Sequence, residues 1–267
     1  MPLPPIIYED DALLVLDKPA GLPVVVEPGA KQTPTLLDQV RGQYGATATN
    51  VHRPDAESSG LAVFAKTKPA LDFLSGQFQA KTAWQSWHAF VIVRPTGEGA
   101  EFWPRDEAQR VPPEFAMDWW IGQDGDRPGA MQAFRRNGGQ PARTVFKVEE
   151  NFGEHALLHC RPESNRRHQL RVHLAAAGLP VLNDALYGLA DAPLRLSQIK
   201  RGYKGGADEK PMIRQLALHA SGLMLNHPLT RAAVAFESPL PVEFEIALKN
   251  LRKFGRSQRH GRSRSSN

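Results

Sequence analysis

Asp55 is the carboxylate of this chain that is best placed to do chemistry. It ends the segment His52-Arg53-Pro54-Asp55 and precedes a turn of small residues, Ser58-Ser59-Gly60. The run at 61–65 is short, apolar and branched, which predicts a buried strand. Asp55 should therefore lie on a loop that a rigid strand holds, beside Arg53, as catalytic groups often do. Taken alone, these residues slightly favour a plainer interpretation, in which Asp55 starts a turn and Arg53 is a surface charge.

A second segment is rich in arginine and histidine. It has the sequence Pro162-Glu163-Ser164-Asn165-Arg166-Arg167-His168-Gln169-Leu170-Arg171-Val172-His173-Leu174. We expect a helix over 167–177, with Arg167 and Arg171 on one face because they are four residues apart. His168 and His173 are five residues apart, roughly 140° round a helix, and would not share a face. The chain also has one cysteine, so we expect no metal site.

Together, the two segments resemble motifs of the RluA-type family of RNA pseudouridine synthases. The family's first motif is His-Arg-Leu-Asp followed by Thr-Ser-Gly-Leu, and its later motif is Gly-Arg-x-His-Gln-(Leu/Ile)-Arg-Val-His-Leu. The later match continues through Gly178-Leu179-Pro180-Val181-Leu182-Asn183-Asp184-Ala185-Leu186-Tyr187-Gly188. The family's opening resembles Ile7-Tyr8-Glu9-Asp10 through Asp17-Lys18-Pro19-Ala20-Gly21-Leu22, and its close resembles 216–241. The resemblance covers roughly residues 5 to 245, in the right order.

This resemblance implies an α+β fold, in which a mixed, mostly antiparallel sheet is flanked by helices and carries a central RNA-binding cleft. It also implies an isomerase that converts a specific uridine of ribosomal or transfer RNA to pseudouridine. The reaction breaks the bond from ribose to N1 and rejoins the ribose to C5. It needs one carboxylate, as nucleophile or as base, and a target base taken out of its stack. It needs no metal, redox carrier or ATP, so we expect no cofactor.

The matching positions suggest a role for each residue. Asp55 matches the family's catalytic aspartate, and Arg171 matches the arginine whose charge favours the ionised carboxylate. Arg53 matches the arginine that helps to displace the target nucleotide. Trp87 falls where most relatives carry a tyrosine stacked on the uracil, and an indole can stack but has no hydroxyl. Further substrate-binding residues are expected at Arg166, His168 and Leu218.

Several residues depart from the family pattern. Pro54 replaces a leucine and would stiffen the loop before Asp55. Asn165 and Asn183 replace glycines, and asparagine can adopt the positive φ that such turns need. Because of Trp87, the alternative function is a catalytically weak RNA-binding or chaperone protein on the same fold. An unrelated hydrolase that uses Asp55 is a more distant third, because the matching motifs hold no plausible second carboxylate or nucleophile.

The helices and strands that would position these residues can be predicted from hydrophobic periodicity and from the residues that typically start or end such elements. We expect a helix capped by Thr35 through Tyr44, and another that opens at Lys68-Pro69. Apolar alternation predicts more strands than helices, mostly close in sequence, which favours a largely antiparallel sheet. Residues 95–116 and 189–212 look like irregular excursions, that is, long loops outside the regular helices and strands. The expected strands are 84–93, 143–149, 156–161, 216–225 and 231–236, and a final helix covers 242–252.

Composition suits a globular protein of the cytoplasm. The chain has 267 residues, of which 41% are hydrophobic and 23% charged, and no apolar stretch is long enough to span a membrane. Its cysteine, Cys160, lies in an apolar run and should be a buried thiol. We expect a monomer with a catalytic domain at 1–251. The chain begins almost at that domain, so we expect no preceding RNA-binding module.

The net charge of +5 is concentrated at the carboxyl end. Residues 252–267 hold six Lys or Arg and no Asp or Glu, so the remainder carries about −1. Charge therefore gives no evidence that the body binds RNA. We expect the segment 252–267 to be a disordered tail, which is either a solvated end or an arm that contacts phosphates.

Overall fold

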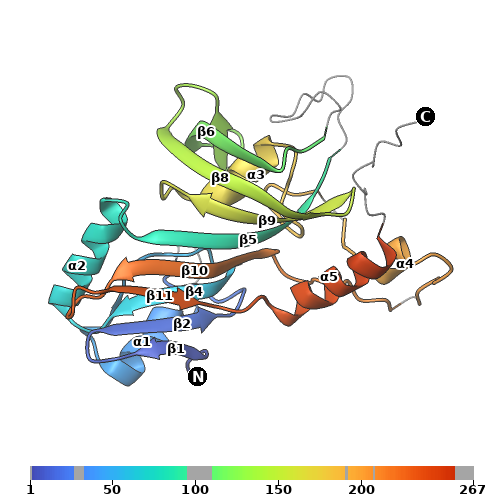
Figure 1. Ribbon diagram of the computed structural model, residues 1–267. Helices are drawn as coiled ribbons and strands as arrows, with labels where there is room; N and C mark the ends of the chain where they lie inside the picture. Colours follow the sequence, from blue (N-terminus) through green and yellow to red (C-terminus); the bar gives the residue numbers. More distant parts are fainter. Residues whose placement is uncertain (1, 27–32, 95–109, 190–191, 207, 256–267) are drawn as a thin grey trace, which may run out of the picture.

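A mixed eleven-stranded sheet forms the frame of the molecule (Figure 1). The computed structural model describes residues 2–26, 33–94, 110–189, 192–206 and 208–255. The order is β1-β2-β4-β10-β5-β9-β8-β6-β7, with β3 beside β4 and β11 beside β10. The strands are β1 (Ile6–Glu9), β2 (Leu13–Lys18), β3 (Thr49–Asn50), β4 (Ser59–Ala65), β5 (Trp84–Ile92), β6 (Glu114–Gln123), β7 (Met131–Phe134), β8 (Gln140–Asn151), β9 (His155–Pro162), β10 (Leu218–Asn226) and β11 (Ala233–Glu237).

The sheet is antiparallel except where β4 meets β10. These two strands run parallel, with Ser59 opposite His219 and Gly60 opposite Ala220. Gly60 has φ +99°, and a Cβ there would lie 2.3 Å from the carbonyl oxygen of Ala220. Only glycine allows this approach. Gly60 therefore lets β4, which begins directly after the Asp55 loop, pair closely with β10. The mixed, mostly antiparallel sheet with helices on it confirms the expected α+β class.

The described part of the chain has five helices. They are α1 (Leu36–Tyr44), α2 (Lys68–Gln79), α3 (Gln169–Ala176), α4 (Leu196–Ile199) and α5 (Val242–Phe254). The Thr35 hydroxyl accepts the backbone N–H of Asp38, and the Asp38 carboxylate accepts that of Thr35, so α1 starts in a capping box. Pro69 lies in the first turn of α2. Both helix starts agree with the sequence prediction.

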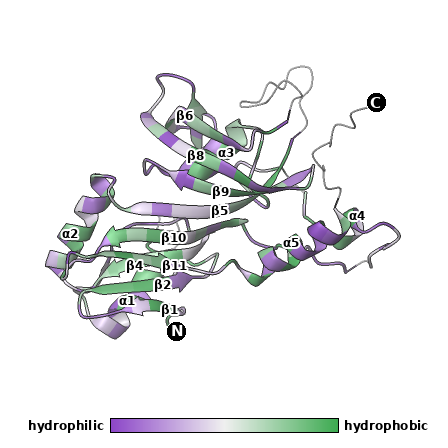
Figure 2. Ribbon diagram, viewed as in Figure 1, coloured by the Kyte–Doolittle hydropathy of each residue, from purple (hydrophilic) through white to green (hydrophobic). Residues whose placement is uncertain are grey.

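The neighbouring strands β2 and β4 are buried on both faces, which is why they are almost continuously apolar. Leu13 and Val15 belong to the larger hydrophobic cluster of the sheet. Leu14 and Leu16 point the other way, into a smaller cluster with Leu36 of α1, as the two-residue period of a strand requires. Figure 2 shows these strands in green, at the level of α1 and α2. The loop that carries Asp55 is thus attached to a strand that is buried on both faces.

The helix before Gly178 differs from its prediction. It starts at Gln169 rather than 167, because His168 adopts a left-handed conformation with φ +55°. Arg167 lies outside the helix, so it does not share a helical face with Arg171 as we expected. Asn183 has the positive φ expected of it, at +60°, but Asn165 does not. The left-handed residue of this turn is His168.

The ends of the predicted elements also shift. Strand β6 begins inside the segment that we expected to be an irregular excursion, and β6 and β7 were not predicted. Helix α5 continues to Phe254, so residues 252–254 are helical and not part of a disordered tail. Residues 256–267 lie outside the described part of the chain. Within that part, no helix has both the length and the apolar character needed to cross a membrane.

Candidate active site

A cavity of about 780 Å³ opens between the loop 52–57, the start of β5, the end of β9 and the turn before α3. Its lining comes from segments on both sides of β5 in the strand order, including the loop before β4 and the end of β9. The residues that the sequence predicted for the site all line it: Arg53, Asp55, Trp87, Arg166, His168, Arg171 and Leu218. The structure therefore brings together segments that are more than 160 residues apart in the chain.

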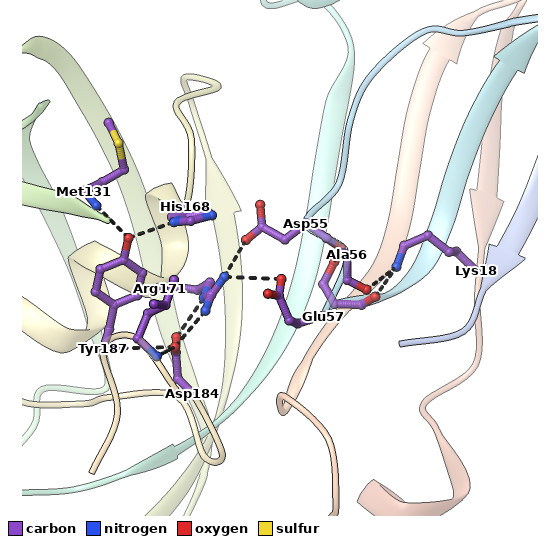
Figure 3. Close-up of polar contacts among 11 residues, drawn as sticks. Lys18, Asp55, Ala56, Glu57, Met131, His168, Arg171, Asp184 and Tyr187 are labelled. Carbon is purple, nitrogen blue, oxygen red and sulfur yellow. Dashed lines mark hydrogen bonds and ion pairs between the residues drawn. The ribbon is translucent and has the colours of Figure 1, made fainter. Parts of the chain in front are cut away.

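Asp55 and Arg171 meet at the edge of this cavity (Figure 3). Asp55 comes from the loop before β4, and Arg171 projects from α3 on the opposite side. An Arg171 guanidinium nitrogen donates to the Asp55 carboxylate at 3.3 Å, and the same nitrogen lies 3.6 Å from a carboxylate oxygen of Glu57. The Asp55 side chain is 20% exposed, whereas that of Arg171 is only 2% exposed. One face of the Asp55 carboxylate is thus held by a buried cation, while the group remains open to a ligand.

Arg171 is itself held by Asp184, a residue to which the sequence assigned no role. Nitrogens Nε and Nη2 of Arg171 donate to the two Asp184 carboxylate oxygens at 2.8 and 2.7 Å. Such a two-point bond fixes the plane of the guanidinium. Burial acts to lower the pKa of Arg171, but the bonds and charge of Asp184, with Asp55 and Glu57, outweigh it and raise the pKa. Arg171 is therefore a permanent cation beside Asp55.

The Asp184 carboxylate also receives two backbone N–H groups, those of Leu186 and Tyr187, at 3.0 and 3.1 Å. The side chain of Asp184 is 0% exposed, so its charge is balanced by Arg171 and by these donors. Asp184 lies in the segment that resembles the family's later motif, and this is the sequence feature that could have drawn attention to it. The sequence alone does not show that this carboxylate faces Arg171.

Lys18 supports the Asp55 loop from the other side (Figure 3). Its buried ammonium donates to the carbonyl oxygens of Pro19 and Ala56 at 3.1 and 3.0 Å, and also to that of Ser58. Two of these carbonyls flank Glu57 in the loop that carries Asp55. Burial lowers the pKa of Lys18 to about 8, although the charges of Asp55 and Glu57 act to raise it. Lys18 lies in the stretch that resembles the family's opening, but its sequence context did not reveal this contact.

Lys18→Met is expected to flatten the dependence of folding stability on pH. Between pH 8 and the ordinary lysine value of 10.5, the unfolded chain binds a proton that the folded chain does not. The free energy of unfolding of the wild type should therefore rise with pH in this window, by on the order of 3 kcal/mol. Urea unfolding from pH 7 to 10.5 measures this rise. The exposed Lys249→Met is the control, and an equal slope in Lys18→Met and wild type would contradict the assignment.

His168 lines the cavity next to Arg171, and Tyr187 contacts both of these residues. The Tyr187 hydroxyl accepts the backbone N–H of Met131 at 2.7 Å and lies 2.7 Å from Nδ1 of His168. Because that oxygen accepts from Met131, it can donate its own hydrogen to His168. Burial lowers the pKa of His168, which favours a neutral imidazole at neutral pH. The guanidinium of Arg171 lies over the Tyr187 ring, 5.2 Å from its centroid.

Trp87 and Leu218 are among the apolar residues that line the cavity. Trp87 lies in β5, between Cys160 of β9 and Ala220 of β10, and is 7% exposed. It belongs to the main hydrophobic cluster and also lines the cavity. Its indole is thus both a core side chain and a surface against which a ligand could lie.

Arginines gather at the rim of this cavity. Arg53 and Arg167 are exposed, and Arg166 is partly buried with its Nε donating to the carbonyl oxygen of Pro141 at 3.2 Å. The rim is suited to anionic ligands, and the floor to a flat apolar one. Among the described residues, no cluster of three or more His, Cys, Asp or Glu side chains is arranged to hold a metal.

Comparison with known proteins agrees with this architecture. Residues 12–176 match the family model described as RNA pseudouridylate synthase. The ribosomal large subunit pseudouridine synthase D of Neisseria meningitidis serogroup A is 35% identical over 254 residues, covering 92% of this chain and 61% of that protein. The protein of the same name from Vibrio cholerae is 33% identical over 269 residues, covering 96% of this chain and 74% of that protein. The chain thus spans about three fifths of the length of the Neisseria relative.

Solved structures share the fold. Human RNA pseudouridylate synthase domain containing 4 superposes with a TM-score of 0.65 at 23% identity, covering 92% of each chain. Human RNA pseudouridylate synthase domain containing 1 gives a TM-score of 0.63 at 20% identity, covering 94% of this chain and 95% of that one. With the family model matching most of the chain, and with the RluA-type motifs assembled around one cavity, the chain belongs to the RNA pseudouridylate synthase family.

Proposed function

We propose that this protein isomerises a uridine of large-subunit ribosomal RNA to pseudouridine, with Asp55 as the group that acts on the ribose. The observation that carries the proposal is the contact between Asp55 and the buried cation Arg171 at the edge of the cavity. The bacterial relatives are ribosomal large subunit pseudouridine synthases, which supports ribosomal RNA as the substrate. Membership of the family supports the type of reaction.

The proposed chemistry needs nothing beyond the chain and its substrate. The bond between ribose C1′ and N1 breaks, the uracil turns, and a new bond forms between C1′ and C5. The hydrogen on C5 is lost as a proton and N1 gains one, so the product is an isomer. Asp55 attacks or deprotonates the sugar, and Arg171 holds the carboxylate in place. Asp184 and Lys18 position this pair rather than touch the substrate.

The cavity also accounts for how the target would be held. A uracil inside an RNA stack is out of reach of Asp55, so the nucleotide must turn out of its helix. Trp87 and Leu218 would receive its flat face, and Arg53 and Arg166 at the rim would contact the displaced backbone. His168, neutral and fixed by Tyr187, borders the same space.

Replacement of Trp87 tests this placement. Trp87→Tyr should retain the rate of pseudouridine formation to within about tenfold, because a phenol ring also stacks. Trp87→Leu keeps an apolar side chain without a π-face and should lower the rate by roughly five- to 150-fold, the range for one lost base stack. Single-turnover assays on a large-subunit ribosomal RNA transcript measure both rates. A Trp87→Leu protein that melts like the wild type and reacts at the wild-type rate would remove Trp87 from the site.

A further inference from the structure

A second tryptophan, Trp84, lines the same cavity, and the reaction proposed above does not use it. It is the first residue of β5 and is 50% exposed, whereas Trp87 is almost completely buried. An indole that is half open to solvent beside a cavity offers a flat π-face on which a base can stack. The reaction proposed above gives this face of Trp84 no role.

Neighbouring side chains hold the Trp84 indole in place. The guanidinium carbon of Arg161 lies over its ring, 5.0 Å from the centroid. Arg161 donates to the Glu163 carboxylate at 3.2 Å, and Arg143 donates to the other oxygen of that carboxylate at 2.9 Å. Arg161 lines the cavity as well. A cation that lies on an aromatic ring favours stacking of the ring and also provides a charge for a phosphate.

The position of Trp84 indicates what it would bind. It is three residues before Trp87 on one strand, which places it roughly 10 Å from Trp87 along the strand, and the two side chains leave the strand on opposite faces because strand side chains alternate. The two indoles therefore cannot touch one base, and a ligand that contacts both must pass round the end of β5 with consecutive bases spread apart. Trp84 stands nearer the end of the strand and is more exposed, so it lies closer to the mouth of the cavity than Trp87 does.

We propose that Trp84 and Arg161 form a stacking site for the base next to the target uridine, with Arg161 on the connecting phosphate. This inference rests on the proposed RNA substrate and adds a requirement to it. The neighbouring nucleotide must be unpaired, and a purine is favoured because its π-face is larger. The site thus contributes to the choice of uridine.

The test compares short RNAs that differ only at the neighbour of a central uridine. One pentamer carries adenine on both sides of the uridine, and the other carries an abasic ribose in place of each adenine. Fluorescence anisotropy gives the Kd of each pentamer for wild type, Trp84→Ala and Trp84→Phe. We expect the wild type to prefer the adenine pentamer by roughly five- to 150-fold. Trp84→Ala should lose this preference and Trp84→Phe should keep most of it.

Arg161 has a matched control elsewhere in the chain. Arg135 lies over Trp119 in a similar way, 5.4 Å from the ring centroid, but neither residue lines the cavity. Arg161→Ala should weaken binding of the adenine pentamer more than Arg135→Ala does, although each removes one positive charge. Equal losses in the two variants would overturn the role of Arg161.

Two outcomes would overturn the stacking site itself. One is a wild type that does not distinguish the pentamers, and the other is a Trp84→Ala protein that still does. Pseudouridine formation in a large-subunit ribosomal RNA transcript, measured separately with the wild type, reports on the proposed function. An active enzyme without the pentamer preference would thus refute the site and leave the reaction standing, whereas an inactive one would refute the reaction.

Discussion

Asp55→Asn is expected to abolish pseudouridine formation while the protein stays folded and binds RNA almost as well. The amide has nearly the same shape as the carboxylate, but it is neither a nucleophile nor a base. Folding should survive because Asp184 still pairs with Arg171 through two bonds when the Asp55 charge is gone. Single-turnover assays, thermal melting and RNA binding measure the three properties.

Glu57→Gln is the matched control for this variant. Glu57 lies on the same loop and contacts the same nitrogen of Arg171, at 3.6 Å, but it is more exposed. Loss of its charge should therefore leave the rate within about tenfold of the wild type. If Asp55→Asn itself retained turnover within tenfold, a change of only ~1.4 kcal/mol in the barrier, Asp55 would not be the reacting group.

Arg171→Met is expected to destabilise the folded protein strongly. It leaves the carboxylate of Asp184, which is 0% exposed, without its cation. Breaking a buried pair from one side costs about 3–5 kcal/mol, and urea unfolding at neutral pH measures the loss. Adding Asp184→Asn should recover part of the stability, because the uncompensated charge is then removed. Activity should stay low in both variants, since Asp55 has lost its partner.

An exposed ion pair provides the comparison for Arg171. Arg214 pairs with Glu243 at 2.6 Å, but the Arg214 side chain is 64% exposed. Arg214→Met should change the free energy of unfolding by less than about 1 kcal/mol. A loss in Arg171→Met no larger than that in Arg214→Met would contradict the view that Arg171 and Asp184 form a buried, mutually dependent pair.

Parts of this site could be predicted from local sequence because local rules determine them. A short apolar run after small residues is a buried strand, which correctly placed Asp55 on a loop before β4. Thr35 and Pro69 are helix-start signals, and both helices begin there. The pairing of Arg171 with Asp55 followed only from the family resemblance, because no local rule joins residues in separate segments.

The remainder depends on tertiary contacts that spacing does not encode. The helix expected over 167–177 puts Arg167 and Arg171 on one face, but the left-handed turn at His168 delays the start of α3 to Gln169. Lys18 resembles an ordinary charge after a strand, and only the fold shows that it is buried against the Asp55 loop. Strand β6 starts within the segment 95–116, where Pro, Gly and charged residues suggest irregular structure, and no prediction covers β7.

The most direct test of the central claim is a map of pseudouridine across total RNA from cells with and without this protein. We expect the modification to disappear from a specific uridine of large-subunit ribosomal RNA when the protein is removed. It should return when the wild type is supplied and stay absent when the Asp55→Asn variant is supplied at the same level. An unchanged map after removal, or restoration by Asp55→Asn, would contradict the account.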